Sequence, residues 1–205
     1  AGATQEPLDP VRYLTNHSSG KMGYALARQA SLRGAEVTLV TGKTSLPPVP
    51  FVDRIPVVTA EEMWEAVTAR QAQQDILVKA AALADYRPQT VSKEKIKKSE
   101  DTLSLSFVRN PDILQYLGQH RLPGQYICGF AMETEHVLER ARQKLLRKGA
   151  DMIVANSLRQ EGAGFETDTN QVTILTKEKE ISLPLLSKAE TASRIWDAIL
   201  QERKK

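Results

Sequence analysis

The sequence predicts an α/β protein with a Rossmann-like, doubly wound and mostly parallel sheet that carries helices on both faces and a small antiparallel hairpin annex. Short apolar segments such as Ile76–Val78 and Met152–Val154 are typical of strands buried on both sides. Between them lie segments with apolar residues at helical spacing, the alternation that parallel strands with crossover helices require. Because no linker, repeat or low-complexity segment divides the chain, we expect one domain over residues 1–205.

Each expected element follows from apolar spacing and from the residues that interrupt it. The prolines of Glu6–Pro10 exclude regular structure near the N-terminus. Apolar residues then recur at helical spacing from Met22, and Gly34 suits a helix stop. Thr59 and Glu62 form the capping box of a second helix. In chain order, the elements expected after the first helix are strands at Glu36–Thr41 and around Arg54–Val58, a helix from Thr59 to about Gln73, strands at Ile76–Val78 and Tyr126–Phe130, a helix over about Glu135–Lys148, a strand at Met152–Val154 and a C-terminal helix with Ile195, Trp196, Ile199 and Leu200.

Three segments depart from this pattern because apolar and polar residues alternate in them: Leu103–Phe107, Gln171–Leu175 and Glu180–Leu183. Alternation indicates half-exposed strands, so we expect them in an antiparallel annex outside the central sheet. The annex is either a solvated edge hairpin or a dimer contact. Ala1–Thr4 resembles the turn after a first strand that the sequence lacks, which suggests a fragment.

The composition favours a cytoplasmic protein without a membrane span. No apolar run reaches the roughly 20 residues that a membrane helix needs, and the N-terminus is polar, unlike a signal peptide. Cys128 is the only cysteine, so an internal disulfide is impossible and a reducing compartment is expected. Its apolar surroundings indicate a buried structural thiol rather than a nucleophile.

The charge pattern favours a small polyanion over nucleic acid. The net charge is +3, and basic residues concentrate in Lys93–Lys98 and Arg140–Lys148. Aromatic residues make up 5% and do not interleave with these clusters, which argues against a stacking platform for single-stranded nucleic acid. The histidines lack metal-ligand spacing, and the sequence assigns no metal ligands.

The segment Asn16–Gly23 brings two hydroxyls, two glycines and a lysine to the start of a helix. Unpaired amides and the positive dipole end favour an anion such as phosphate there. An ordinary capped helix, with Ser18 or Ser19 as N-cap, remains the alternative.

A second candidate region begins where the Ile76–Val78 strand ends. The small residues of Ala80–Ala82 allow a ligand to approach the backbone, and Asp85 is at the rim, where a carboxylate suits a ribose, a base or a metal. A cap or a surface charge is the alternative role of Asp85. The lysines of Lys95–Lys98 suit an anion or a solvated face.

An ordered set of segments resembles bacterial phosphopantothenoylcysteine synthetase, the ligase part of the bifunctional coenzyme A biosynthesis flavoprotein. The resemblance covers almost the whole chain, with Ser157 and Met132 as small departures. The segments that carry it are Glu6–Tyr13 running into Asn16–Gly23, Ala81–Arg87, Lys95–Lys98, Asn110–Ile113, Gly129–Thr134 and Ala155–Asn156.

The resemblance implies that CTP and Mg²⁺ activate the carboxylate of phosphopantothenate as an acyl-cytidylate, and that the amine of cysteine then displaces CMP. It implies that Asn16 serves this reaction as an amide donor and that Lys95 neutralises the triphosphate. It further implies a homodimer, fused to or assembled with a flavin-dependent decarboxylase. The implied CTP-binding residues are Asp85, Lys95, Pro111, Asp112, Ile113, Leu114, Phe130, Lys144 and Lys148, and the implied phosphate and substrate loops comprise Ser18, Ser19, Gly20, Ala81 and Ala82.

Two other functions stay open. One is a Rossmann-type module that binds NADP, although no Gly-x-Gly-x-x-Gly fingerprint follows a strand. The other is a scaffold domain that binds a partner through the hairpin annex.

Overall fold

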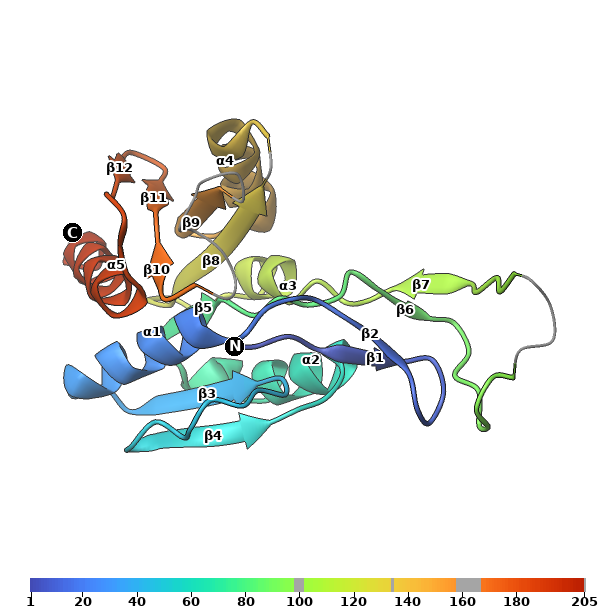
Figure 1. Ribbon diagram of the computed structural model, residues 1–205. Helices are drawn as coiled ribbons and strands as arrows, with labels where there is room; N and C mark the ends of the chain where they lie inside the picture. The colour runs from blue at the N-terminus through green and yellow to red at the C-terminus, as the bar shows by residue number, and fades with distance from the viewer. Residues whose placement is uncertain (98–101, 134, 158–166, 205) are drawn as a thin grey trace.

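A five-stranded mixed sheet forms the centre of the computed structural model, which describes residues 1–97, 102–133, 135–157 and 167–204 (Figure 1). The strands β5, β8 and β9 run parallel, as the sequence predicts, whereas β11 and β12 each run antiparallel to their neighbour. Across the sheet the order is β12 (Glu180–Ser182), β11 (Val172–Thr176), β9 (Met152–Ser157), β8 (Tyr126–Glu133) and β5 (Ile76–Lys79).

Helices cover both faces of this sheet, which confirms the predicted layering. On one face lie α1 (Lys21–Leu32) and α5 (Lys188–Glu202), where the indole Nε1 of Trp196 donates a 2.9 Å hydrogen bond to the carbonyl oxygen of Leu26. On the other face lie α2 (Ala60–Thr68), α3 (Ile113–Gln119) and α4 (Val137–Lys148). None of the helices in the described ranges is long and apolar enough to cross a bilayer.

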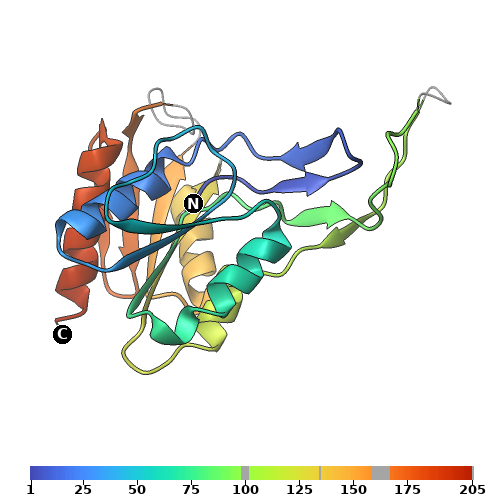
Figure 2. The same ribbon diagram turned by 90° about the horizontal axis from the view of Figure 1, so that it is seen from below.

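Two further parts lie beside the central sheet (Figures 1 and 2). The first is a separate parallel pair, β3 (Val37–Thr41) with β4 (Val52–Pro56). The second is an arm that projects from the body. It consists of the hairpin β1 (Gln5–Pro7) and β2 (Tyr13–Thr15) together with the antiparallel pair β6 (Tyr86–Pro88) and β7 (Phe107–Arg109). The prediction of no regular structure over Glu6–Pro10 is therefore wrong at Glu6 and Pro7, since proline is tolerated in a strand of a two-stranded hairpin. The remaining elements are the 3₁₀ turn η1 (Gln71–Gln73) and the short pair β10 (Thr169–Asn170) and β13 (Leu186–Ser187).

Two of three capping signals are predicted correctly, and the third, the N-cap of α1, is predicted wrongly. Thr59 and Glu62 form both hydrogen bonds of the capping box, and Gly34 adopts φ 81° just past α1. The N-cap of α1, however, is Gly20 with φ 81°, rather than Ser18 or Ser19. A left-handed residue at this point turns the chain sharply into the helix, and glycine adopts that conformation without a Cβ penalty.

The alternating C-terminal strands were wrongly assigned to the annex. Residues of β11 pair along their whole length with β9 in the central sheet, and four of the five β11 residues are buried. Alternation predicts one exposed face, but α4 and α5 cover the two faces of β11. The predicted strand Leu103–Phe107 is also misplaced: residues 102–106 have no regular structure, and the antiparallel strand outside the sheet, β7, begins only at Phe107. The second helix also ends earlier than predicted, at Thr68, and a 3₁₀ turn follows it.

Two buried positions show how tightly β8 is packed. Cys128 is fully buried, which raises the pKa of its thiol and confirms a structural role. Gly129 lies where α3 crosses the strand. A Cβ built on it would meet Cδ2 of Leu114 at 2.5 Å and Cδ1 of Ile153 at 3.0 Å, so glycine lets α3 lie directly on the sheet.

We expect Gly129→Ala to lower the free energy of unfolding by about 1–3 kcal/mol, the usual range for overpacking a filled core. Urea denaturation measures the change. In a Leu114→Ala background the obstructing methyl groups are gone, so the same substitution should be much less destabilising there. Equal losses in the two backgrounds would contradict this account of Gly129.

Candidate active site

Three hydrogen bonds hold the loop that follows β5 in place at the carboxyl edge of the parallel strands. The amide of Ala82 donates to the carbonyl of Gly2 at 2.9 Å, and the amide of Ala84 donates to Oγ1 of Thr4 at 3.3 Å. The side chain of Asn110 donates from Nδ2 to the carbonyl of Ala84 at 2.8 Å. These bonds fix the backbone of the small-residue loop, which is the pre-organisation that a close ligand contact needs.

The loop before α1 lies against the same region. Nδ2 of Asn16 donates to the carbonyl of Ala82 at 3.1 Å, and Oγ1 of Thr44 donates to the carbonyl of Ser19 at 3.1 Å. A Cβ built on Gly20 would lie 3.3 Å from Cα of Gly2. The structure therefore brings the predicted substrate loops, with Ser18, Ser19, Gly20, Ala81 and Ala82, to one place.

A charged group lies beside the loop. Nζ of the buried Lys148 forms an ion pair with the carboxylate of Asp112 and a 3.2 Å hydrogen bond with Oε1 of Gln115. Burial disfavours the charged form of Asp112, but the hydrogen bonds from Lys148 and Gln115 hold the pKa of this carboxyl below its usual range. Burial, reinforced by the nearby Lys144, lowers the pKa of Lys79 to about 8.

The side chains of Ile113 and Leu114, two of the predicted CTP-binding residues, cannot contact a ligand. Ile113 and Leu114 are each 2% exposed within the core under α3, so only their backbone can face a ligand. Asp112 is the N-cap of α3 and accepts from the amide of Gln115 at 3.0 Å. Pro111 precedes it, half-buried, and Asp85 is exposed at the rim.

Two predicted residues lie on opposite sides of the sheet. Phe130 packs, half-buried, on the face covered by α1 and α5, whereas Lys144 belongs to α4 on the other face. A single ligand can therefore contact both Phe130 and Lys144 only if it extends across the carboxyl edge of the sheet, where the parallel strands end.

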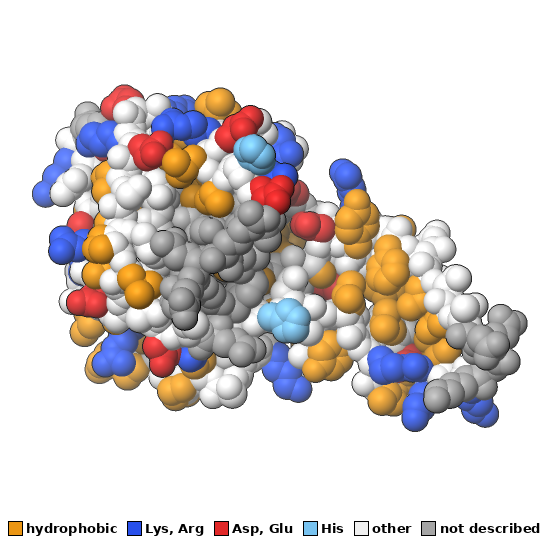
Figure 3. Space-filling model, turned by 45° about the horizontal axis from the view of Figure 1, so that its top comes forward, with side chains coloured by type: hydrophobic (Ala, Val, Ile, Leu, Met, Phe, Trp, Pro, Cys, Tyr) orange, Lys and Arg blue, Asp and Glu red, His pale blue; other side chains and the backbone are white. Residues whose placement is uncertain are grey.

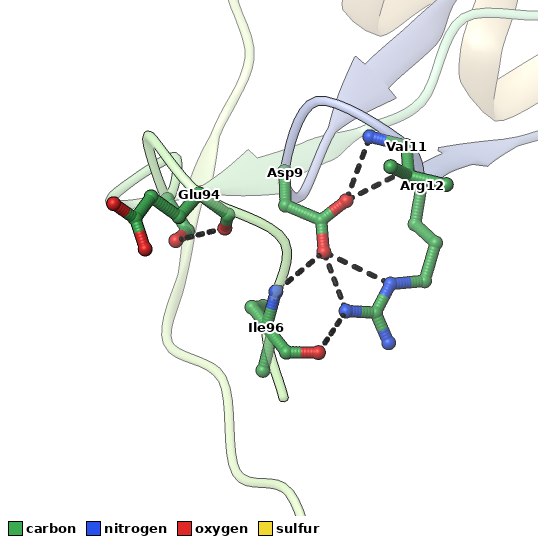
Figure 4. Close-up of polar contacts among 6 residues, drawn as sticks. Asp9, Val11, Arg12, Glu94 and Ile96 are labelled. Carbon is green, nitrogen blue, oxygen red and sulfur yellow. Dashed lines mark hydrogen bonds and ion pairs between the residues drawn. The ribbon is translucent and has the colours of Figure 1, made fainter. Parts of the chain in front are cut away.

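Lys95 is exposed and belongs to the stretch between β6 and β7, the two strands of the projecting arm. Its neighbour Ile96 is pinned by the turn between β1 and β2 (Figure 4). The carboxylate of Asp9 accepts from the amide of Ile96 at 3.1 Å, and the guanidinium of Arg12 donates to the carbonyl of Ile96 at 2.8 Å. Lys98, the last lysine of the predicted cluster, lies outside the described residues.

Asp9 is the centre of this arrangement. It is 3% exposed and accepts from the backbone amides of Val11 and Arg12, both at 2.8 Å, and from Nε of Arg12 at 2.9 Å. The Arg12 guanidinium is the main reason that the pKa of Asp9 lies far below its usual range. The carboxylate therefore stays ionised in all but strongly acidic solution, and the hold on Ile96 persists across the physiological range.

Sequence reasoning missed the positioning roles of Gly2, Asp9, Arg12 and Asn110. The signal for Asp9 and Arg12 was present, because an aspartate three residues before an arginine between prolines and a strand is typical of a structured turn. The pairing of Asn110 with Ala84 had no local signal, since 26 residues separate them. In the described ranges, no group of three histidine, cysteine, aspartate or glutamate side chains could hold a metal ion.

Fold and site together define a ligand-binding domain of the doubly wound α/β class, with loops gathered at the carboxyl edge of parallel strands. Residues 1–202 match the DNA/pantothenate metabolism flavoprotein C-terminal domain, and the chain belongs to that family.

Similar proteins and a similar solved structure support the membership of this family. The chain is 48% identical over 203 residues to the coenzyme A biosynthesis bifunctional protein CoaBC of Escherichia coli and 44% identical over 201 residues to that of Bacillus subtilis. These matches cover 98% and 97% of the chain, but it spans only about half the length of either relative, 50% and 49%. A crystal structure of the C-terminal domain of a CoaBC protein matches with a TM-score of 0.85 and 41% identity, covering 100% of this chain and 93% of that one.

We expect Asp9→Ala to release the segment that carries Lys95, because the carboxylate that accepts from the amides of Val11, Arg12 and Ile96 is lost. The amide of Ile96 should exchange with solvent at least about tenfold faster, measured by hydrogen exchange, while the amides of β8 stay protected. Asp53→Ala, an exposed aspartate on β4, is the matched control. Unchanged exchange at Ile96 would show that something other than Asp9 holds the segment.

Proposed function

We propose that this domain joins phosphopantothenate to cysteine in coenzyme A biosynthesis, with CTP as the activating nucleotide. The observation that carries the proposal is the convergence of two loops, Asn16–Gly20 and Ala80–Asp85, at the carboxyl edge of the sheet in a domain of this family. The relatives named as bifunctional coenzyme A biosynthesis proteins support it.

The chemistry has two balanced steps. A carboxylate oxygen of phosphopantothenate attacks the α-phosphorus of CTP, so that a P–O bond forms and pyrophosphate leaves. The neutral amine of cysteine then attacks the acyl carbon: a C–N bond forms, the acyl C–O bond breaks so that CMP leaves, and the nitrogen loses a proton to water. Positioning and neutralisation of charge supply the acceleration in both steps. In this proposal the side-chain amide of Asn16 donates a hydrogen bond to the acyl oxygen, and Lys95 neutralises charge on the triphosphate.

The other site residues have complementary roles in the proposal. Backbone groups at Pro111–Leu114 read the edge of cytosine, and Phe130, Lys144 and Lys148 line the nucleotide site with Asp85 at its rim. Mg²⁺ usually binds through one or two carboxylates, substrate phosphates and water. A single exposed carboxylate such as Asp85 fits a metal that arrives with the triphosphate, and the metal would offset phosphate charge there.

We further propose a homodimer formed through the arm. Figure 3 shows hydrophobic side chains gathered on the projecting arm, an arrangement typical of a protein contact. We also propose that the domain is fused to or assembled with a flavin-dependent decarboxylase, which the bifunctional name and the roughly doubled length of the relatives support. The exposed apolar residues of the arm are Val11, Tyr13, Leu14, Tyr86, Val91, Leu103, Leu105 and Phe107.

The test is pyrophosphate release by the full-length natural protein, given phosphopantothenate, cysteine and each nucleoside triphosphate in turn. CTP should support faster release than ATP at equal concentration, and omission of phosphopantothenate should abolish it. Faster turnover with ATP would refute the assignment of CTP. In a thermal-shift comparison CTP should stabilise the protein and NADP should not; the reverse would favour the dinucleotide-binding module instead.

Asn16→Asp should separate the two half-reactions. The carboxylate removes the amide donor and repels the oxyanion that forms as cysteine attacks, and losing one such donor typically costs about 2.7–4 kcal/mol. We therefore expect the variant to consume CTP but to accumulate acyl-cytidylate, detected by rapid quench with labelled CTP.

Gln119→Glu makes the same amide-to-carboxylate change at the exposed end of α3 and should leave both steps unchanged. The amide of Asn16 also holds the carbonyl of Ala82. If that is its only function, both steps will slow together and no intermediate will accumulate, which would exclude the proposed role at the acyl oxygen.

A further inference from the structure

Two chain segments of the proposed site meet at the base of the β6–β7 pair. The loop Ala80–Asp85 leads directly into β6, and the segment Pro111–Leu114 follows β7 after a single residue, Asn110 (Figure 1). One position past the last paired residues of these strands, the amide of Asn110 donates to the carbonyl oxygen of Asp85 at 2.9 Å. Asn110 therefore joins the two segments where the arm meets the body.

The side chain of Asn110 uses both ends of its amide. Its Nδ2 donates to the carbonyl oxygen of Ala84 at 2.8 Å, and its Oδ1 accepts from a guanidinium nitrogen of Arg87 at 3.0 Å. The same nitrogen of Arg87 donates to the carbonyl oxygen of Arg109 at 3.1 Å. Because a guanidinium can only donate, Arg87 sets the orientation of the amide and directs Nδ2 to Ala84.

Asn110 is also linked stiffly to the first turn of α3. Pro111 has a fixed φ and restricts the residue before it, so little rotation is available between Asn110 and Asp112. Asp112 caps α3 by accepting from the amide of Gln115 at 3.0 Å, and it forms an ion pair with Lys148. A shift of this first turn is therefore carried to Asn110 and to the loop that its side chain holds.

An asparagine at this position could instead serve only to close the base of the arm. The two roles predict different behaviour. A residue that only closes the base lowers stability when it is replaced, and it leaves the effect of one ligand on the other unchanged. A residue that connects the two segments changes that mutual effect, which is a coupling free energy between two sites.

We propose that Asn110 is a positioning residue that couples the nucleotide segment Pro111–Leu114 to the substrate loop Ala80–Asp85, so that CTP and phosphopantothenate each strengthen the binding of the other. A ligand that orders one segment also orders the other through Asn110, so the second ligand has less motion to remove. This inference rests on the substrates assigned under Proposed function, and it adds the route by which they act on each other.

The test measures the coupling by calorimetry in the full-length natural protein. The nucleotide probe is α,β-methylene-CTP, in which a methylene group replaces the oxygen between the α- and β-phosphorus atoms, so pyrophosphate cannot leave. Saturating phosphopantothenate should tighten the binding of this probe to the wild-type protein at least about fivefold. In Asn110→Asp the factor should fall close to unity, because the carboxylate keeps the contact with Arg87 but repels the carbonyl oxygen of Ala84.

The control is Gln89→Glu, the same amide-to-carboxylate change at an exposed residue of the arm, and it should keep the full factor. Arg87→Gln is a second variant that leaves Asn110 in place. Loss of the guanidinium lets the amide of Asn110 turn, so the factor should fall here too, by less than in Asn110→Asp. In an Asn110→Ala background the same substitution should change the coupling no further, since Arg87 acts through the amide.

Two results would overturn the proposal. One is independent binding of the two ligands by the wild-type protein. The other is full coupling in Asn110→Asp and Arg87→Gln, even with reduced stability; if Asn110→Asp does not fold, the factor in Arg87→Gln alone decides. Failure of the wild-type protein to bind either ligand is a different result, which would overturn the assigned substrates and this inference with them.

Discussion

The backbone pairing of Ala1–Thr4 is the interaction on which the rest of the structure depends. This short segment bonds to the end of β3 through Val40 and Gly42, and to the loop after β5 through Ala82 and Ala84. A Cβ on Gly42 would lie 2.0 Å from the carbonyl oxygen of Ala3, so the approach of the two chains requires glycine at that position. The same bonds that connect the sheets therefore shape the loop at the candidate site.

Most of the sheet could be predicted because its strands carry their own signal. Apolar β-branched segments such as Met152–Val154 indicate burial on both sides without knowledge of their partners. The placement of β11 could not be predicted in this way. Its alternating sequence reads as half-exposed, and only the long-range packing of α4 and α5 on its two faces makes it a central strand. The exposure of β11 is therefore set by tertiary packing, which the local pattern does not contain.

The candidate site likewise has parts that the sequence predicts and parts that it does not. The loop Asn16–Gly20 and the small residues after β5 are visible in the sequence because helix starts and strand ends have recognisable residues. What holds them in place is not visible, since Asn110 and Ala84 are distant in sequence, as are Asp9 and Ile96. Such pairs depend on how the arm folds back on itself. The structure places Lys95 on the arm, and this position does not test its predicted role at the triphosphate. That role stays a prediction.

Electrostatics at the candidate site involves Lys79, the last residue of β5, which directly precedes the small-residue loop. Its pKa falls from 10.5 to about 8 on folding, so the unfolded chain binds more protons between these values and stability rises with pH over that range. Below pH 8 the buried cation disfavours the folded state. Asp112 offsets part of this charge, but it is already paired with Lys148. A polyanion bound near Lys79 would offset the remaining positive charge at neutral pH, which is a physical reason for the candidate site to favour one.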